Sequence, residues 1–441
     1  MSLYNTAFMK EIGSNVRRIF LDYAATTPVD EKVFQAMRPY FGAKFGNPGS
    51  LHSFGQEAIG AVDLSREIIA KAIGAEFREV VFTGSATEAN NLVLRGLVSG
   101  IKYHVSGDWK PRLIISAVEH ESVLETVRAL EKKGVEVIII PVNKNGIVDL
   151  KKLKEILNER TVFVSIMYAN NEIGTIQPIV EISRIIGDFR EELGIRNKES
   201  VGNSKFQIHN SLFPFFHTDA VQALQFLDCN VNNLGVDLMT ISAHKIYGPK
   251  GVGALYIKNN NLGNPFISAI VSGGGQEFGL RSGTENVPNI VGFGKVVELV
   301  EKNREKEVRR ILELKKRLWS GIKKIYSKAE INGVPTRMTR KNANDTKIKN
   351  FGQLPNILNV YFPDYKAEEV MIGFDLAGVA VSSGSACSSR AAKVSHVITA
   401  LGYSEERARR SIRFSLGWPT TKKEIDTTIK IFKNLISRLK K

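Results

Sequence analysis

Cysteine is almost absent from this chain, which has only Cys229 and Cys387 among 441 residues. Two thiols so far apart cannot form a disulfide framework or a four-thiolate metal site, so no metal is expected and a reducing compartment is favoured. The sequence lacks an apolar run long enough to cross a bilayer, and residues 1–20 lack the apolar segment of a signal peptide. These absences predict a cytoplasmic enzyme.

Acidic residues are also in short supply: 61 Lys and Arg against 45 Asp and Glu give a formal net charge of +16. Such an excess would fit a nucleic-acid partner or an acidic protein partner. The basic residues are spread out, however, and are densest where helix surfaces are expected, at residues 301–324 and 430–441. No basic stretch is interleaved with aromatic residues, so a solvated surface is favoured and direct nucleic-acid binding is not expected.

Short apolar runs alternate with helical patterns between about residues 79 and 258. The runs are rich in Val, Ile and Phe without strict alternation, as in strands buried on both faces. The predicted strands are 80–83, 113–117, 135–141, 162–167, 213–217, 236–241 and 253–257, and the predicted helices between them are 87–97, 122–133, 150–157 and 180–193. This pattern predicts an α/β fold, a mostly parallel sheet covered by helices, with ligands at the carboxyl ends of its strands.

The alternation of short apolar runs with helical patterns ends after about residue 275. A long charged helix at 287–326, strand-like runs at 356–361 and 379–382, and a last helix from Lys422 predict a smaller α+β domain. We therefore expect a large domain at 20–275 and a small domain made of 1–19 and 276–441. Two polar stretches, 196–211 and 337–353, are rich in Asn, Lys and Ser without an apolar period, and are expected to be surface loops or partly disordered.

Polar residues gather directly after the predicted strands. The run TGSATE at 83–88 leads from a strand into a helix, where backbone amides and the helix dipole can hold an anion, although a plain tight turn would look the same. His120 could stack on a flat cofactor or be an ordinary satisfied polar side chain. Asn171 could bind a phenolic oxygen or belong to an ordinary turn. Taken singly, these features leave both interpretations open.

Asp219 and Lys245 carry a stronger signal. Asp219 ends an apolar run, and a carboxylate is costly to bury there without a cation, which a protonated pyridine nitrogen would supply. Lys245 follows another buried run, where a lysine is rare as mere structure, and a desolvated amine is suited to attack on an aldehyde.

Together these features resemble the active site of fold-type I pyridoxal-phosphate enzymes, specifically the class V aminotransferase family and, within it, the cysteine desulfurases of the NifS/IscS branch. The motifs that carry the resemblance are LDYAATTP at 21–28, GNPGSLH at 46–52, NNEIG at 170–174, SAHKIYGPKG at 242–251, RSGT at 281–284, SSGSAC at 382–387 and SIRFSLG at 411–417. The resemblance covers essentially the whole chain from residue 20 onward. Seven motifs in the family's order make coincidence an inadequate explanation.

The resemblance implies a role for each matching residue. Lys245 would attach pyridoxal 5'-phosphate as a Schiff base, Asp219 would pair with its pyridinium nitrogen, and His120 would stack on its ring. Asn171 and Gln222 would bind the phenolic oxygen. The phosphate would be held by Ala86, Thr87, Ser242 and His244, joined by Thr284 from the other subunit of a homodimer. Arg413 and Asn47 would bind the substrate.

Cys387 is the catalytic thiol that the resemblance implies. It would take sulfur from L-cysteine, leave L-alanine, and pass a persulfide to an acceptor for iron–sulfur cluster assembly or tRNA thiolation. Displacement of sulfur by sulfur is the step of thiol–disulfide exchange, for which a thiolate is suited. Arg390 and Lys393 could raise the thiolate fraction. Cys229 lies outside every motif and is expected to be structural.

The chain departs from the family's pattern at two places. Gly84-Ser85 stands where the family usually has Ser-Gly, a swap that still permits the turn. Residues 392–394 are Ala-Lys-Val where Leu-Glu-Pro is common, although the loop length is that of group I desulfurases. The second departure puts the usual docking of a scaffold partner in doubt.

Three other functions remain possible at this point. A selenocysteine lyase or an aminotransferase of the same family would keep the cofactor and change the reaction. A non-catalytic scaffold that binds nucleic acid would instead use the positive charge. Cys387 separates the desulfurase from the aminotransferase, because transamination requires no such thiol.

Overall fold

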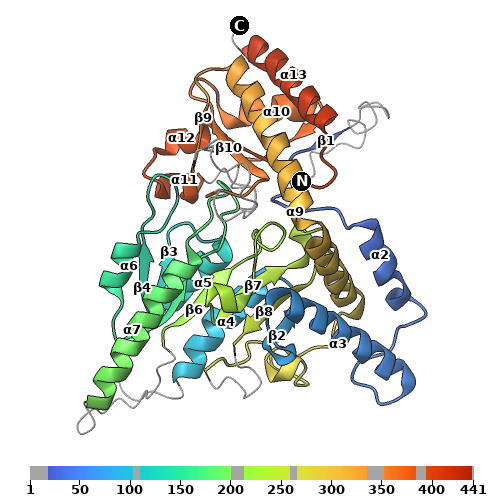
Figure 1. Ribbon diagram of the computed structural model, residues 1–441, viewed down its shortest axis with the longest axis vertical. Coiled ribbons are helices and arrows are strands. Elements are labelled where there is room, and N and C mark those ends of the chain that lie inside the picture. Colours follow the sequence, from blue (N-terminus) through green and yellow to red (C-terminus); the bar gives the residue numbers. More distant parts are fainter. Residues whose placement is uncertain are drawn as a thin grey trace.

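The computed structural model describes residues 18–102, 110–199, 213–258, 266–334, 352–383 and 394–439. Its centre is a seven-stranded sheet in the order β2-β8-β7-β6-β5-β3-β4 (Figure 1). The strands are β2 (Val80–Thr83), β3 (Arg112–Ser116), β4 (Glu136–Ile140), β5 (Thr161–Ser165), β6 (Phe215–Asp219), β7 (Leu238–Ser242) and β8 (Gly253–Ile257). The pairs from β4 to β7 are parallel, and β8 is antiparallel to both of its neighbours. The predicted mostly parallel sheet is confirmed.

Each of the seven predicted apolar runs forms a strand, and its ends differ from the prediction by no more than about two residues, as is usual for boundaries. The runs do not alternate because both faces of the sheet are covered. Along β3, Ile114 packs into one hydrophobic cluster while Leu113 and Ile115 pack into another. The covering helices are α4 (Ala86–Lys102) and α5 (Glu121–Glu131) on one face, and α3 (Ser53–Ile73), α6 (Leu150–Ile156), α7 (Ile179–Glu199) and part of α9 (Val287–Ile325) on the other.

The C-terminal part is built on a smaller sheet. Its strands are β12 (Ser411–Ser415), β10 (Ile357–Tyr361) and β9 (Glu330–Ile331), in that order and antiparallel. A separate parallel pair joins β1 (Ile19–Phe20) to β11 (Val379–Ala380), so the start of the described chain lies against its C-terminal part. Helices α10 (Ala367–Leu376) and α13 (Lys422–Leu439) flank this region in Figure 1.

Helix α9 links the two parts of the molecule. It confirms the predicted long helix and runs from beside α3 to beside α13 (Figure 1). Its apolar residues, including Phe293 and Leu318, lie in the same hydrophobic cluster as Phe414 of the smaller sheet. Among the helices that the structure describes, none combines the length and apolar character needed to cross a membrane.

The prediction that residues 196–211 and 337–353 are surface loops is wrong for the parts of these stretches that the structure describes. Helix α7 continues to Glu199, into the stretch expected to be a loop, and residues 200–212 lie outside the described residues. In the second stretch, residues 337–351 also lie outside them, but Gln353 is only 2% exposed. Its amide donates to Ile173 O at 2.7 Å and accepts from Lys315 Nζ at 3.0 Å. A polar side chain can be buried when its hydrogen bonds are made, which composition alone does not reveal.

Candidate active site

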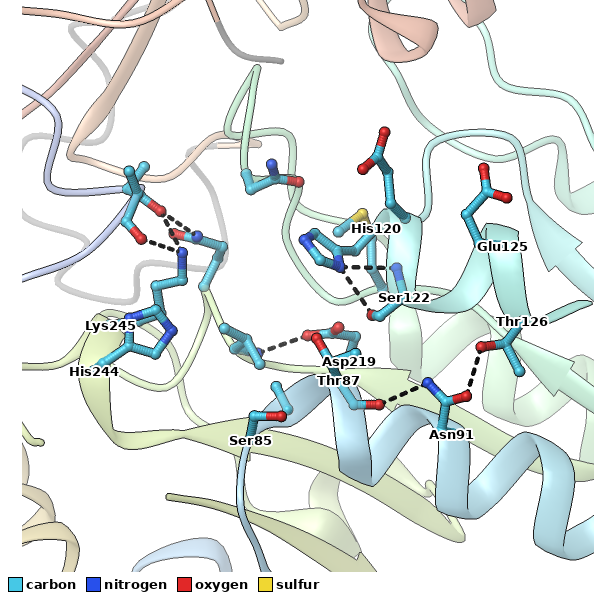
Figure 2. A pocket seen from close by; sticks show the side chains of 18 of the residues that line it. Ser85, Thr87, Asn91, His120, Ser122, Glu125, Thr126, Asp219, His244 and Lys245 are labelled. Atoms are coloured by element: carbon cyan, nitrogen blue, oxygen red, sulfur yellow. Dashed lines mark hydrogen bonds between the residues drawn. The ribbon is translucent and has the colours of Figure 1, made fainter. Parts of the chain in front are cut away.

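A cavity of about 540 Å³ lies at the carboxyl edge of the central sheet (Figure 2). Parallel strands bring their carboxyl ends to one edge, so residues that follow different strands meet there. Nine of the predicted site residues line the cavity: Ala86, Thr87, His120, Asn171, Asp219, Gln222, His244, Lys245 and Arg413. The structure thus assembles most of the predicted site within one chain.

Lys245 is fixed by a tight turn after β7. It ends the 3-10 helix η3 (Ala243–Lys245), and its Nζ donates to Ala24 O at 2.8 Å and Ala25 O at 2.7 Å. Tyr247 continues the turn with a φ of 75°, which is uncommon for a residue other than glycine. The Tyr247 ring stacks on Trp418 at 4.2 Å, which stabilises this conformation. The turn therefore directs the Lys245 amine to the cavity.

Asp219, the last residue of β6, is a buried carboxylate on the cavity wall, seen near the centre of Figure 2. One oxygen accepts from the Val221 amide at 3.0 Å and the other from Asn90 Nδ2 at 3.0 Å. Asn90 is fully buried in α4 and also donates to Ser122 Oγ at 2.8 Å. In the described part of the chain Asp219 has no ion-pair partner, so a cation bound in the cavity would complete it.

His120 follows β3 and caps helix α5. Its Nδ1 accepts from the Ser122 amide at 3.1 Å and lies 2.8 Å from Ser122 Oγ. Burial lowers the pKa of His120, and the nearby Lys245 adds to this effect while Asp219 opposes it. A neutral ring that accepts at Nδ1 carries its proton on Nε2. His120 therefore presents a neutral imidazole with an Nε2–H donor to the cavity.

An anion can be held where α4 begins. Ala86 and Thr87 lie in the first turn of this helix, whose amides lack intrahelical acceptors. His244 is close by on the cavity wall, and its Nδ1 lies 3.2 Å from Thr26 Oγ1. Burial lowers the pKa of His244 to about 4, so its ring is neutral at physiological pH. Ser242 does not line the cavity, but its Oγ is buried and has no hydrogen-bond partner among the described residues.

Arg413 comes from the smaller sheet, on β12, and is 2% exposed. Its Nη2 forms an ion pair with Asp22 Oδ1 at 2.7 Å, and its Nη1 donates to Asn171 O at 2.8 Å. Gln222 also lines the cavity, and its Nε2 donates to Ala24 O at 3.0 Å. The contacts of Arg413 with Asp22 and Asn171 fix its guanidinium at the cavity wall, where a carboxylate-bearing ligand would meet it.

Besides Ser242, two further predicted residues in the described part of the chain do not line this cavity. Thr284 lines a separate cavity of about 210 Å³, together with Gly84 and Arg281. Asn47 is exposed, and its Oδ1 accepts from the Gly49 amide at 2.9 Å. The contribution of Thr284 from a second subunit therefore stays a prediction, and so does the role of Asn47 in substrate binding.

Cys387, Arg390 and Lys393 lie outside the described residues. The described residues on either side of this segment are hydrogen-bonded to residues at or near the cavity. The Arg413 amide donates to Ser382 O at 2.6 Å, and Ser395 Oγ donates to Glu172 Oε2 at 2.5 Å. Cys229, by contrast, is 1% exposed, and burial raises the pKa of its thiol to about 12. A protonated, inaccessible thiol agrees with the structural role expected for Cys229.

Sequence reasoning missed several residues that support the site. Glu119 is fully buried beside His120, and its Oε1 accepts from Ser116 Oγ at 2.6 Å and from the Met167 amide at 2.7 Å. It thereby joins the ends of β3 and β5, and burial raises its pKa to about 8. Asn90 and Asp22 were also missed. The only local signal was their position within or near the quoted motifs, because their partners are far away in sequence.

Comparisons with known proteins identify the family of this chain. The family model described as Aminotransferase class-V matches residues 19–191 and 205–428, and the chain belongs to this family. One curated relative within it is the cysteine desulfurase IscS of Dictyoglomus turgidum, which is 42% identical over 96% of each chain. The predicted family and the α/β fold of a fold-type I enzyme are therefore confirmed, and enzymes of this family depend on pyridoxal phosphate.

Two solved structures are similar over most of the chain. The NifS-like protein of Rickettsia africae ESF-5 has a TM-score of 0.77 at 32% identity, covering 96% of this chain and all of that one. SspA, solved in complex with cysteine, has a TM-score of 0.71 at 33% identity, covering 91% of this chain and 99% of that one.

Proposed function

We propose that this chain is a cysteine desulfurase, which takes sulfur from L-cysteine, leaves L-alanine and carries the sulfur as a persulfide on Cys387. The observation that carries the proposal is the meeting of Lys245, Asp219, His120 and Arg413 around one cavity. An amine, a buried carboxylate, a neutral imidazole and a guanidinium are the groups that a pyridoxal-phosphate enzyme acting on an amino acid requires. The 42% identity to a cysteine desulfurase favours this reaction within the family.

The residues present fit pyridoxal phosphate. Bound there, the cofactor would supply an electron sink for the bonding electrons of the substrate's α-carbon. Lys245 would hold its aldehyde carbon, and Asp219, which has no ion-pair partner among the described residues, would face its pyridinium nitrogen. His120 would cover the ring. Asn171 and Gln222 would bind the phenolic oxygen.

The phosphate would lie at the start of α4. Ala86 and Thr87 offer main-chain amides there, and Thr87 adds a hydroxyl. His244 is neutral and can donate without a charge of its own. The unpartnered Oγ of Ser242, among the described residues, would gain an acceptor from a buried anion.

The substrate would be oriented by its carboxylate. Arg413 can grip it in a bidentate manner while Asp22 and Asn171 O keep the guanidinium in place. Lys245 Nζ lies at the same cavity and would be the base that takes the substrate's α-proton. Asn47 would contribute to substrate binding from outside this cavity.

Sulfur transfer would use the thiolate of Cys387. It attacks the substrate sulfur, an S–S bond forms as the C–S bond breaks, and the electron pair stays on carbon, which takes a proton to give alanine. Support comes from the two chain segments that flank Cys387, because Ser382 is hydrogen-bonded to Arg413 and Ser395 to Glu172. The persulfide would pass to an acceptor protein for iron–sulfur cluster assembly or tRNA thiolation.

A homodimer would complete the site. Large apolar side chains lie exposed around Asn47: Phe41 (65%), Phe45 (72%), Leu51 (92%) and Phe54 (51%). Exposed apolar groups gathered in one segment mark a contact surface. A second copy that covers them would also allow Thr284 to reach the phosphate of its partner, as the resemblance implies. The cytoplasmic location stays a prediction.

The test is to incubate the purified protein with L-cysteine and to measure alanine, sulfide and the mass of Cys387-containing peptides. We expect alanine formation and one extra sulfur atom on Cys387, with Lys245→Ala as the inactive blank. Cys387→Ser should abolish sulfur transfer, whereas the matched control Cys229→Ala should retain it. Full-rate sulfide release by Cys387→Ser, or transamination without alanine, would refute the proposal.

A further inference from the structure

The turn that opens α4 is capped by a carboxylate. Ser85 Oγ accepts from the Glu88 amide at 3.1 Å, and Glu88 Oε2 accepts from the Gly84 amide at 2.9 Å. This is close to the reciprocal Ser-x-x-Glu capping arrangement, which satisfies amides at a helix start. It places a negative charge at the turn that would receive a phosphate dianion. Such a carboxylate opposes phosphate binding unless its charge is compensated.

Arg281 provides that compensation from almost two hundred residues further along the chain, as the separation of 193 between the two partners shows. Its Nε donates to Glu88 Oε1 at 2.8 Å, and both side chains are partly buried, with 27% and 22% exposed. The turn, the carboxylate and the guanidinium are packed closely. A Cβ added at Gly84 would lie 2.8 Å from Glu88 Oε2 and 3.5 Å from Arg281 Nη2. The ion pair is therefore part of the turn itself.

A second, buried ion pair fixes the segment that carries Arg281. Arg66 binds Glu277 through two hydrogen bonds, at 2.7 and 2.9 Å, and Glu277 Oε2 also accepts from the Phe82 amide at 2.8 Å. Phe82 belongs to β2, the strand that leads into the capped turn. Glu277 and Phe278 have φ values of 50° and 59°, a strained conformation that persists only where the surroundings enforce it.

We propose that Arg281 is a positioning residue of the phosphate-binding turn: by pairing with Glu88 it cancels the charge of the capping carboxylate, so that the free amides of Ala86 and Thr87 can hold a phosphate dianion. The inference rests on the proposed function, because it assumes that the cofactor's phosphate lies at this turn. The RSGT resemblance implied a role only for Thr284. Without Arg281, Glu88 keeps capping the helix but repels the phosphate.

The experiment compares two ligands that differ only in the phosphate. The full-length apoprotein is titrated with pyridoxal phosphate and with pyridoxal, and binding is followed by the absorbance of the ligand linked to Lys245. For Arg281→Gln we expect the Kd for pyridoxal phosphate to rise about fivefold to tenfold, and the Kd for pyridoxal to change less than about twofold. Arg160→Gln is the matched control, because Arg160 also forms a partly exposed ion pair. Its partner is Glu136, the first residue of β4.

Rescue distinguishes charge compensation from simple support of the fold. Adding Glu88→Gln to Arg281→Gln removes the unpaired charge, and the affinity for pyridoxal phosphate should return to within about twofold of the original. If the double variant binds as weakly as Arg281→Gln, or if Arg281→Gln weakens both ligands equally, the inference is overturned. Should Arg281→Gln fail to fold, Glu88→Gln alone still decides, because it should bind pyridoxal phosphate at least as tightly as the original chain.

The two proposals fail in different ways. If the original chain does not bind pyridoxal phosphate at Lys245, the proposed function is wrong. If it binds and desulfurises cysteine, but Arg281→Gln keeps its full affinity for pyridoxal phosphate, only the role of Arg281 is wrong.

Discussion

Two lysines in different parts of the molecule are held in similar ways. Lys245, after β7 of the large sheet, donates to Ala24 O and Ala25 O. Lys315, in the middle of α9, donates to Leu354 O at 2.6 Å, Ile357 O at 3.3 Å and the side-chain oxygen of Gln353. Lys245 lines the cavity, whereas Lys315 is 2% exposed and does not line it.

The difference shows that access, rather than the kind of partner, separates a reactive amine from a structural one. Carbonyl oxygens accept hydrogen bonds from both amines, but of the two only Lys245 lines the cavity, where a ligand can reach it. Lys315 instead joins α9 to the segment at 353–357, and Gln353 in turn donates to Ile173 O beside the cavity. Burial lowers the pKa of Lys315 to about 7.

The comparison is tested most strongly by replacing each lysine with alanine. Lys245→Ala should reduce alanine formation from cysteine about 1,000-fold or more and change the free energy of unfolding by less than about 1 kcal/mol. Lys315→Ala leaves a void and carbonyl groups without donors, and should lower the free energy of unfolding by about 3–5 kcal/mol. Denaturant unfolding and turnover of the folded fraction measure both effects. Equal behaviour of the two variants would contradict the comparison.

A smaller effect should appear in the pH dependence of stability. Between about pH 7 and the ordinary lysine pKa of 10.5, the unfolded chain holds a proton on Lys315 that the folded chain has lost. Lys315 therefore makes stability rise with pH across this window, by up to roughly 1 kcal/mol per pH unit. Relative to Lys315→Met, the original chain should gain stability from pH 7 to 10. A constant difference between the two unfolding curves would show that Lys315 keeps its charge when buried.

The smallest effect concerns Glu119, a buried acid next to the cavity. Burial raises its pKa from 4.5 to about 8, although hydrogen bonds from Ser116 and Met167 oppose the shift. Between about pH 4.5 and 8, the folded chain holds a proton on Glu119 that the unfolded chain lacks. Stability therefore falls as the pH rises through this range. From pH 6 to 8 the original chain should lose about 2 kcal/mol relative to Glu119→Gln. Urea unfolding at several pH values measures this, and parallel curves would contradict it.

The sequence predicted the features that depend on local pattern. Lys245, Asp219 and His120 each follow an apolar run, and that position was enough to place them at one edge of a parallel sheet. Strands with few apolar residues were missed. β9 has only two residues, and β12 contains Arg413 between its apolar residues, so neither gave a clear strand pattern.

The supporting contacts could not be predicted because each partner lies far away in sequence. Asn90 reaches Asp219, Asp22 reaches Arg413, and Arg281 reaches Glu88 only once the sheet has formed. The polar composition around Gln353 predicted a surface loop, but its hydrogen bonds to Lys315 and Ile173 allow it to be buried.

By itself, then, the sequence determined the alternation of strands and helices and the chemical groups at the strand ends, since both are written in neighbouring residues. Only the tertiary structure decided which buried charges have partners, which lysine opens to the cavity and which is sealed, and which carboxylate caps the phosphate-binding turn. The physical reason is that burial and charge compensation depend on groups brought together by folding, and a linear pattern contains neither.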